Sequence, residues 1–207
     1  MSASLAIAGA GGHARVVADT AEALGWTVSL FDDNLAGQQS GPWCVADTLS
    51  WLMTHPDHFD NFVVGIGNNS VRRRIQQEII SRGGRPATLV HPMAWCSPRA
   101  TLGAGSVMFA GAVLNAGAVT GSACILNTGA TVDHDCLLAD AVHVSPGAHL
   151  AGSVTTGACC WIGIGAAVRQ QIVIGDNAIV GAGATVVADV AASTTVVGTP
   201  ATPLVRS

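Results

Sequence analysis

The sequence contains no lysine, and charged residues of either sign are scarce. All nine basic residues are arginine, the formal net charge is −4, and charged residues make up only 11% of the chain. Proteins that follow a nucleic-acid backbone carry a basic face or stripe. We therefore expect no nucleic-acid partner.

Long apolar runs are also missing, although 49% of the 207 residues are hydrophobic. A membrane-spanning helix needs about 20 consecutive apolar residues, and glycines or polar residues interrupt every run here. The first residues, MSASLAIAGAGGHA, lack the basic segment that opens a signal peptide. We expect no membrane insertion and a cytoplasmic protein.

A repeat of six residues dominates the second half of the chain. From Thr101 to Val190 the sequence divides into fifteen sixes without an insertion, from TLGAGS to TVVADV. The second position is aliphatic or Met in all but two sixes, and the sixth is always Ala, Ser, Cys, Val or Ile. Such a fixed period is typical of a solenoid. With the second and sixth positions inward, each six is a short strand followed by a corner rich in glycine and asparagine.

Three strands make a coil of 18 residues, so the repeat predicts about five stacked coils. Cys124 and Cys160 are sixth-position residues two coils apart, and we interpret them as small core fillers with reduced thiols. The outward first positions are unusually apolar, which indicates burial against another subunit; β propensity at exposed positions is the alternative. These positions are Val107, Val113, Val119, Ile125, Leu137, Trp161, Val173 and Ile179.

Residues 1–86 follow a different pattern. LAIAGAGGHARVVADTAEALGWTVSLFDDN predicts a strand, a glycine loop, a helix from about Ala14 to Leu24 and a strand ending at Asp32 and Asp33. FVVGIGNNSVRRRIQQEIISRG predicts another strand, a turn and a helix. Both strand-to-helix turns present free backbone N–H groups, which favour anions.

The glycine loop fits the spacing G-x-G-x-x-A at Gly9, Gly11 and Ala14, with Asp32 about 20 residues on, as a dinucleotide fingerprint requires. So short a segment holds only about half of a dinucleotide fold, so one nucleotide is the better fit. A tight turn without ligand is the alternative, and His13 favours a ligand. A solvated helix surface is the alternative for Arg72. The candidate ligand contacts here are Gly11, Gly12, His13, Asp32, Asp33, Gly67, Asn68, Asn69 and Arg72.

The motifs GAGGH, FDDN, GIGNN, SVRRRI, NTGATVDHD, HVSPGAHLAG and VVGTPA together resemble the bacterial nucleotide-sugar acetyltransferases of the hexapeptide-repeat superfamily. That family includes UDP- or GDP-linked 4-amino-sugar N-acetyltransferases and sialic acid O-acetyltransferases. The resemblance implies an α/β, Rossmann-like βαβ domain in residues 1–86 and an all-β left-handed parallel β-helix with a C-terminal tail in residues 87–207. It also implies a homotrimer and acetyl-CoA as co-substrate.

The stretch ILNTGATVDHDC collects polar residues within an otherwise apolar repeat. His134 is a fourth-position corner residue, Asp135 follows it, and Gly152 stands one coil above. A neutral imidazole suits a general base that an adjacent carboxylate orients, and the Gly152 amide is a candidate oxyanion donor. The family resemblance implies the same base and acidic neighbour.

His143 points outward from the second face of the repeat, whereas His134 follows the third face. A neighbouring subunit is needed to bring them together, so we assign His143 and Asn127 to substrate contacts across an interface. Interface packing is the alternative for His143 and the preferred assignment for His149. A metal site is not expected, because consecutive acidic and histidine residues at one corner diverge.

The coenzyme is expected along the upper coils, near Gly152, Ile164, Ala182 and the tail VVGTPATPLVRS. Arg169, Arg206 or backbone amides are the candidates for contacts with its phosphates.

Together these features predict an acetyl-CoA-dependent N-acetyltransferase acting on a nucleotide-linked amino sugar, a 4-amino sugar by resemblance, in bacterial surface glycan biosynthesis. O-acetylation of sialic acid or a related sugar is one alternative, and a non-catalytic scaffold is another. The glycine loop favours a substrate that carries a nucleotide, and amines need less activation than hydroxyls. The pairing of His134 with Asp135 argues against the scaffold.

Overall fold

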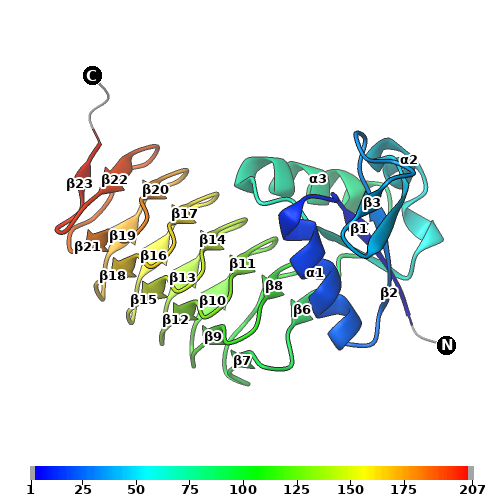
Figure 1. Ribbon diagram of the computed structural model, residues 1–207. Coiled ribbons are helices and arrows are strands. Elements are labelled where there is room, and N and C mark those ends of the chain that lie inside the picture. The colour runs from blue at the N-terminus through cyan, green and yellow to red at the C-terminus, as the bar shows by residue number, and fades with distance from the viewer. Residues whose placement is uncertain (1–2, 205–207) are drawn as a thin grey trace.

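The computed structural model describes residues 3–204, which form an α/β domain followed by a parallel β-helix (Figure 1). Five strands of the first domain pair in the order β3-β4-β2-β1-β5, and all are parallel except β3 with β4. The elements are β1 (Ser4–Ala8), α1 (Gly12–Ala23), β2 (Thr27–Phe31), β3 (Gln39–Ser40), β4 (Trp43–Asp47), α2 (Leu49–Thr54), a 3-10 helix (Pro56–His58), β5 (Asn61–Val64) and α3 (Asn69–Ser81).

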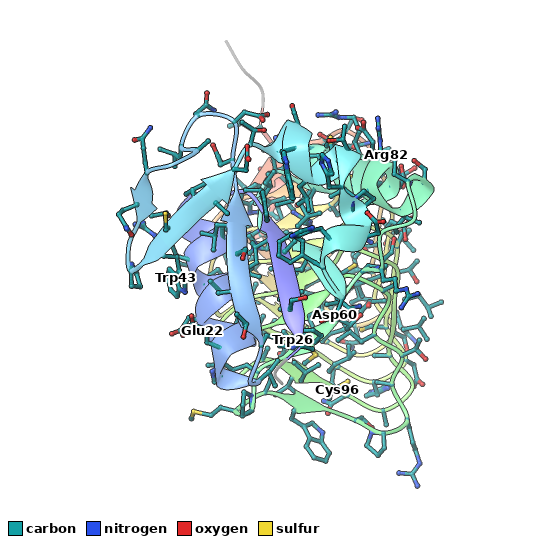
Figure 2. All side chains as sticks on the ribbon, turned by 90° about the vertical axis from the view of Figure 1, so that its right-hand side faces the viewer. Glu22, Trp26, Trp43, Asp60, Arg82 and Cys96 are labelled. Carbon is teal, nitrogen blue, oxygen red and sulfur yellow. The ribbon has the colours of Figure 1, made fainter. Side chains whose placement is uncertain are left out.

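The predicted βαβ unit is confirmed, with α1 beginning at Gly12 rather than Ala14 because Gly11 is the residue that precedes the helix. The β3–β4 hairpin and α2 had no counterpart in the sequence prediction. The hairpin is tied to α1 by the indole N–H of Trp43, which donates to the carboxylate of Glu22 at 2.8 Å. Figure 2 shows these two side chains on the outer flank of the domain, in front of the β-helix coils.

The β-helix has three flat faces, named here by their order in the repeat, and each strand up to Val186 is the first two residues of a six. Partners lie one coil of 18 residues apart, as in the pairing of Ile125 with His143. The faces wind into a left-handed parallel β-helix, as predicted. Pairing extends back to Leu89, earlier than the repeat counted from Thr101.

The strands of the β-helix are as follows. The first face holds β10 (Val119–Thr120), β13 (Leu137–Leu138), β16 (Thr155–Thr156) and β19 (Val173–Ile174). The second holds β6 (Leu89–Val90), β8 (Val107–Met108), β11 (Ile125–Leu126), β14 (His143–Val144), β17 (Trp161–Ile162), β20 (Ile179–Val180), β22 (Thr195–Val197) and β23 (Thr202–Pro203). The third holds β7 (Trp95–Cys96), β9 (Val113–Leu114), β12 (Thr131–Val132), β15 (His149–Leu150), β18 (Ala167–Val168) and β21 (Thr185–Val186).

The interior is filled by the second and sixth positions of the sixes, as the period predicts. Cys124 and Cys160 are buried in this core, in agreement with their assignment as small fillers. From Gly105 to Gly183 every corner turns at its fifth position, which has a left-handed φ whether the residue is a glycine or, like Asp135, carries a side chain. A left-handed φ costs a residue other than glycine about 1–2 kcal/mol. The stacking of the coils therefore holds many corner residues in a backbone conformation that their residue type disfavours.

Some of the apolar first positions are buried within the chain and others are exposed. The prediction that all of them lie in a subunit interface is therefore wrong for the buried ones. Val107 and Ile125 are 2% and 0% exposed, because they pack against Ala14 and Val17 of α1 in the same chain. Leu137, on the first face, remains 52% exposed. The α/β domain therefore covers the lower coils of the second face (Figure 1).

Helix α3 follows the first corner, the turn between the first and second faces, and contacts successive coils. Gln76 donates to the carbonyl of Ala104 at 2.9 Å. One turn nearer the helix start, Arg72 donates to Ala123 in the next coil at 2.8 Å, and Asn69 reaches Cys159 at 3.0 Å. A helix turn rises about 5.4 Å and a coil about 4.8 Å, so the side chains of α3 can contact several coils in succession.

Two buried threonines at second positions of the first face give a matched stability test. The hydroxyl of Thr156 has no hydrogen-bond partner within residues 3–204, whereas that of Thr120 accepts from the Gly103 N–H at 3.0 Å. Thr156→Val is expected to raise the free energy of unfolding by about 1 kcal/mol, and Thr120→Val to lower it by a similar amount. Urea unfolding of both variants checks this, and shifts in the same direction would contradict it.

Within residues 3–204, no helix combines the length and the apolar character that a membrane crossing requires.

Candidate functional site

His134 and Asp135 form a hydrogen-bonded pair at the third corner, the turn that follows the third face. The ring Nδ1 of His134 lies 2.8 Å from a carboxylate oxygen of Asp135. The carboxylate is an acceptor, so Nδ1 carries the proton and Nε2 presents its lone pair in the neutral ring. The two side chains are 61% and 67% exposed, so a substrate can approach Nε2 from solvent.

The coil above leaves room for this ring only because it holds a glycine. A Cβ atom at Gly152 would collide with Cε1 and Nε2 of His134. The predicted register is therefore confirmed. Fourth-position amides form no rung of the β ladders, and no hydrogen-bond acceptor is found for the Gly152 N–H among residues 3–204. A backbone donor thus stands beside the basic nitrogen.

The carboxylate of Asp135 raises the pKa of His134 above its ordinary value through their hydrogen bond, and the charge of Asp133 adds to the effect. The imidazole is thereby a stronger base than a free histidine. The Asp133 carboxylate also accepts from the His134 N–H at 2.7 Å, which fixes the backbone of the corner.

A second feature is a cavity of about 410 Å³ between the carboxyl ends of β1 and β5 and the start of α1. Its lining includes the Gly9–His13 loop, Asp32 and the Gly65–Gly67 loop. Gly9 has φ +113°, which requires glycine. The amides at the start of α1 lack acceptors within the helix, so they favour an anionic group in this cavity.

The acidic residues of the FDDN motif do not act alike. One carboxylate oxygen of Asp32 accepts from the Ala10 N–H at 3.1 Å and braces the glycine loop from within the cavity lining. Asp33 is directed to α2, where its carboxylate accepts from the Ser50 N–H at 3.2 Å. Asp32 therefore lies with the ligand-binding candidates, and Asp33 lies outside the cavity lining.

The second loop also departs from the prediction. Asn68 caps α3 by accepting from the Val71 N–H at 3.1 Å. Asn69 is buried, and its amide donates to the carbonyls of Cys159 and Cys160. Among these candidates, only Gly67 lines the cavity.

Arg72 departs furthest from its predicted role as a direct contact of the ligand. Its guanidinium is 1% exposed, and its donors are used by carbonyl and amide oxygens of the protein. No donor remains for a direct contact with a phosphate.

A buried pair of histidines joins the two domains. His13 of α1 and His143 of β14 have ring centroids 6.2 Å apart. His143 stacks at 4.9 Å on Trp161, and His13 makes an edge contact with Phe109. The chain's own α/β domain therefore covers His143, a contact that the predicted role of His143 in a site shared between subunits did not include.

The tautomer of His143 follows from its hydrogen bonds. The Asn127 carbonyl oxygen accepts from the Thr128 N–H at 2.9 Å, so its NH₂ group faces Nε2 of His143 at 3.0 Å. Nε2 is then the acceptor, and Nδ1 carries the proton of the neutral ring. Asn127 and His143 are therefore joined by a hydrogen bond. The sequence had placed both on the same side of the predicted site.

An apolar groove of about 410 Å³ lies along the second face and second corner, the turn between the second and third faces. It contains the predicted Ile164 and Ala182 and begins at His143. The lining also includes Trp161, which the sequence indicated only as one of the apolar first positions, and Ser145, whose buried hydroxyl has no hydrogen-bond partner among residues 3–204.

The groove and the His134 corner lie on opposite edges of the third face. The structure therefore brings together His13, Asn127 and His143 near the groove, but leaves His134, Asp135 and Gly152 at another corner. Arg169 is exposed on that same third corner, and Arg206 lies outside the described residues. Among residues 3–204, no group of three or more histidine, cysteine or acidic side chains is arranged to hold a metal ion.

The two buried histidines make stability sensitive to acid. Burial, reinforced by the charge of Arg72, lowers the pKa of His13 to about 4 and that of His143 to about 3. Below the unfolded pKa of about 6.5, the unfolded chain binds protons that the folded chain does not. The free energy of unfolding should then fall by about 1.4 kcal/mol per pH unit for each histidine, until pH reaches the folded values.

Denaturant unfolding across this pH window checks the expectation. His13→Gln and His143→Gln should each flatten the slope, with His58→Gln, at an exposed histidine, as the control. Unchanged slopes in both variants would show that neither ring is held neutral.

Comparisons with known proteins agree with this architecture. Residues 4–79 match the family model of the PglD N-terminal domain. The acetyltransferase domain of PglB from Neisseria gonorrhoeae is 44% identical, with 97% of this chain and 99% of that one covered and a TM-score of 0.93. That domain has also been solved with acetyl coenzyme A.

A second solved structure is a variant of perosamine N-acetyltransferase from Caulobacter crescentus in complex with CoA and GDP-perosamine. It is 35% identical, with 98% and 97% of the two chains covered and a TM-score of 0.93. Among curated proteins, GDP-perosamine N-acetyltransferase of Escherichia coli is 32% identical over 127 residues, 61% of this chain and 57% of that enzyme. The alignments span about half the length of the curated relatives.

Proposed function

The chain belongs to the hexapeptide-repeat sugar acetyltransferases, and from this membership we propose that it is an acetyl-CoA-dependent N-acetyltransferase of a nucleotide-linked amino sugar. The observation that carries the proposal is the His134–Asp135 pair beside the free amide of Gly152. A base and an oxyanion donor at adjacent positions are what acyl transfer from a thioester requires.

The chemistry follows from these atoms. The sugar amine attacks the thioester carbonyl while Nε2 of His134 takes its proton, and the Gly152 N–H stabilises the negative charge on the carbonyl oxygen. Asp135 stabilises the imidazolium that forms. When the tetrahedral intermediate collapses, the C–S bond breaks and the coenzyme thiolate leaves with the proton held by His134.

Substrate placement follows from the two cavities. The nucleotide occupies the cavity at the glycine loop, where helix amides favour the diphosphate. The sugar extends past His13 and His143, and the pantetheine arm of acetyl-CoA runs along the apolar groove at Ile164 and Ala182. Arg169, at the third corner, is the cation among the described candidates for the coenzyme phosphates.

A homotrimer completes the site. His134 and the groove lie on opposite edges of the third face, so a three-fold arrangement can place the third corner of one subunit against the second corner of the next. Each site then takes His134, Asp135 and Gly152 from one chain and the nucleotide cavity and groove from its neighbour. We further propose that the enzyme acts in the cytoplasm, where acetyl-CoA is available, on a precursor of a bacterial surface glycan.

The competing functions predict different reactions. Purified protein with acetyl-CoA and a panel of UDP-, GDP- and dTDP-linked amino sugars should release free thiol with at least one of them. Release only with sialic acid would favour O-acetylation instead, and no release with any acceptor would favour a scaffold. The nucleotide cavity supports the first outcome, because sialic acid alone has no group for it.

The pH dependence of kcat should show the effect of Asp135 on the pKa of His134. Its hydrogen bond raises the pKa of His134, so kcat should fall on the acid side at a pH above that of an ordinary histidine. Asp135→Asn removes this charge and should move the acid limb to lower pH while reducing kcat by less than His134→Ala does. An unmoved acid limb would mean that Asp135 does not tune the base.

A further inference from the structure

Arg72 is a buried cation without a carboxylate partner among residues 3–204. Nε donates to Ala123, one terminal nitrogen donates to the carbonyls of Ile66 and Gly67, and the other donates to Asn69 and Ala141. These bonds are 2.8–3.1 Å long. The positive charge is therefore balanced only by carbonyl dipoles.

The acceptors come from both domains. Ile66 and Gly67 form part of the nucleotide cavity, whereas Ala123 and Ala141 are first-corner residues of consecutive coils. One side chain thus fixes the cavity wall against the β-helix that carries the catalytic groups.

Arg72 also sets the direction of two peptide planes. In a trans peptide the C=O and N–H groups point in opposite directions. Because the Ile66 and Gly67 carbonyls face Arg72, the amides of Gly67 and Asn68 face away from it. Neither amide has a hydrogen-bond acceptor among the described residues, so both remain available to a ligand.

We infer that Arg72 is a positioning residue for the nucleotide diphosphate: it turns the Gly67 amide toward the anion bound in the cavity and places a buried positive charge behind it. This rests on the proposed nucleotide-sugar substrate. Burial is the larger cause that lowers the pKa of His13 and His143, and the charge of Arg72 adds to it, so both rings stay neutral beside the sugar.

The test compares Arg72→Met and Arg72→Lys with Arg73→Met, a change at the adjacent residue, which makes a 3.6 Å surface ion pair with Asp140. Calorimetric titration with UDP and with GDP should show about tenfold or greater loss of affinity in Arg72→Met for whichever nucleotide the wild type binds. Arg72→Lys should recover part of the loss, because lysine keeps the charge but not the planar array of donors. Affinity for CoA should stay within about twofold in every folded variant.

Unchanged nucleotide affinity in Arg72→Met, or equal losses for nucleotide and CoA, would overturn the inference. If the Arg72 variants do not fold, hydrogen exchange of the wild type decides: UDP or GDP should slow exchange at Gly67, and unaltered exchange would overturn the inference. A wild type that binds neither UDP nor GDP would also overturn the inference. A wild type that binds one of them but transfers no acetyl group would refute the proposed function and leave the role of Arg72 standing.

Discussion

Replacing His134 by Ala is expected to lower kcat by about 10²–10⁴, the usual contribution of a positioned general base. The side chain is exposed at a corner and makes its only described side-chain bond to Asp135, so the β-helix should remain intact. The affinity for CoA should change little, because the groove at Ile164 and Ala182 lies at another corner. Steady-state thiol release and calorimetric binding of CoA separate the two effects.

The matched control is Gln170→Ala, at the equivalent corner position one coil above Gly152. Its kcat should remain within about twofold of the wild type. A fully active His134→Ala enzyme would contradict the proposed mechanism and favour the alternative of a non-catalytic scaffold.

Mixed trimers of His134→Ala and His143→Ala chains should regain activity that neither parent has. His143→Ala is expected mainly to weaken acceptor binding, so the assay uses acceptor well below saturation. If each site pairs His134 of one chain with His143 of the next, every mixed trimer contains one intact site. Random assembly of equal amounts should then give about a quarter of the wild-type activity, because about three quarters of trimers are mixed and one site in three is intact.

Co-expression with two affinity tags isolates the mixed species. The control pairs His134→Ala with a chain that carries both substitutions, which leaves no His134 in any site and should give no recovery. If the site were built within one chain, the first mixture would also stay at the level of its parents. The outcome therefore distinguishes a shared site from a site within one subunit.

The β-helix could be predicted because its cause is local. Each six repeats the same inward positions, and a coil of three sixes places Gly152 directly above His134. The candidate base, its carboxylate and the small residue above them could consequently be placed by counting along the chain. The conformation of Asp135, with φ +59°, follows from its fifth position and not from its residue type.

The contacts between domains could not be predicted in the same way. Arg72 bonds to residues 51 and 69 positions away, and its place near the helix start indicates a ligand contact but not these partners. The burial of Val107 and Ile125 likewise depends on where α1 docks. An apolar first position shows only that a surface is covered, and the covering element can be another subunit or another part of the same chain.

The most direct test of the central claim is an NMR spectrum of the product formed from acetyl-CoA and the nucleotide-linked amino sugar that supports thiol release. The proposed N-acetyltransferase should give an acetyl group joined to the sugar nitrogen as an amide, with the nucleotide still attached. An acetyl ester on a hydroxyl oxygen, or the absence of any acetylated nucleotide sugar, would contradict it.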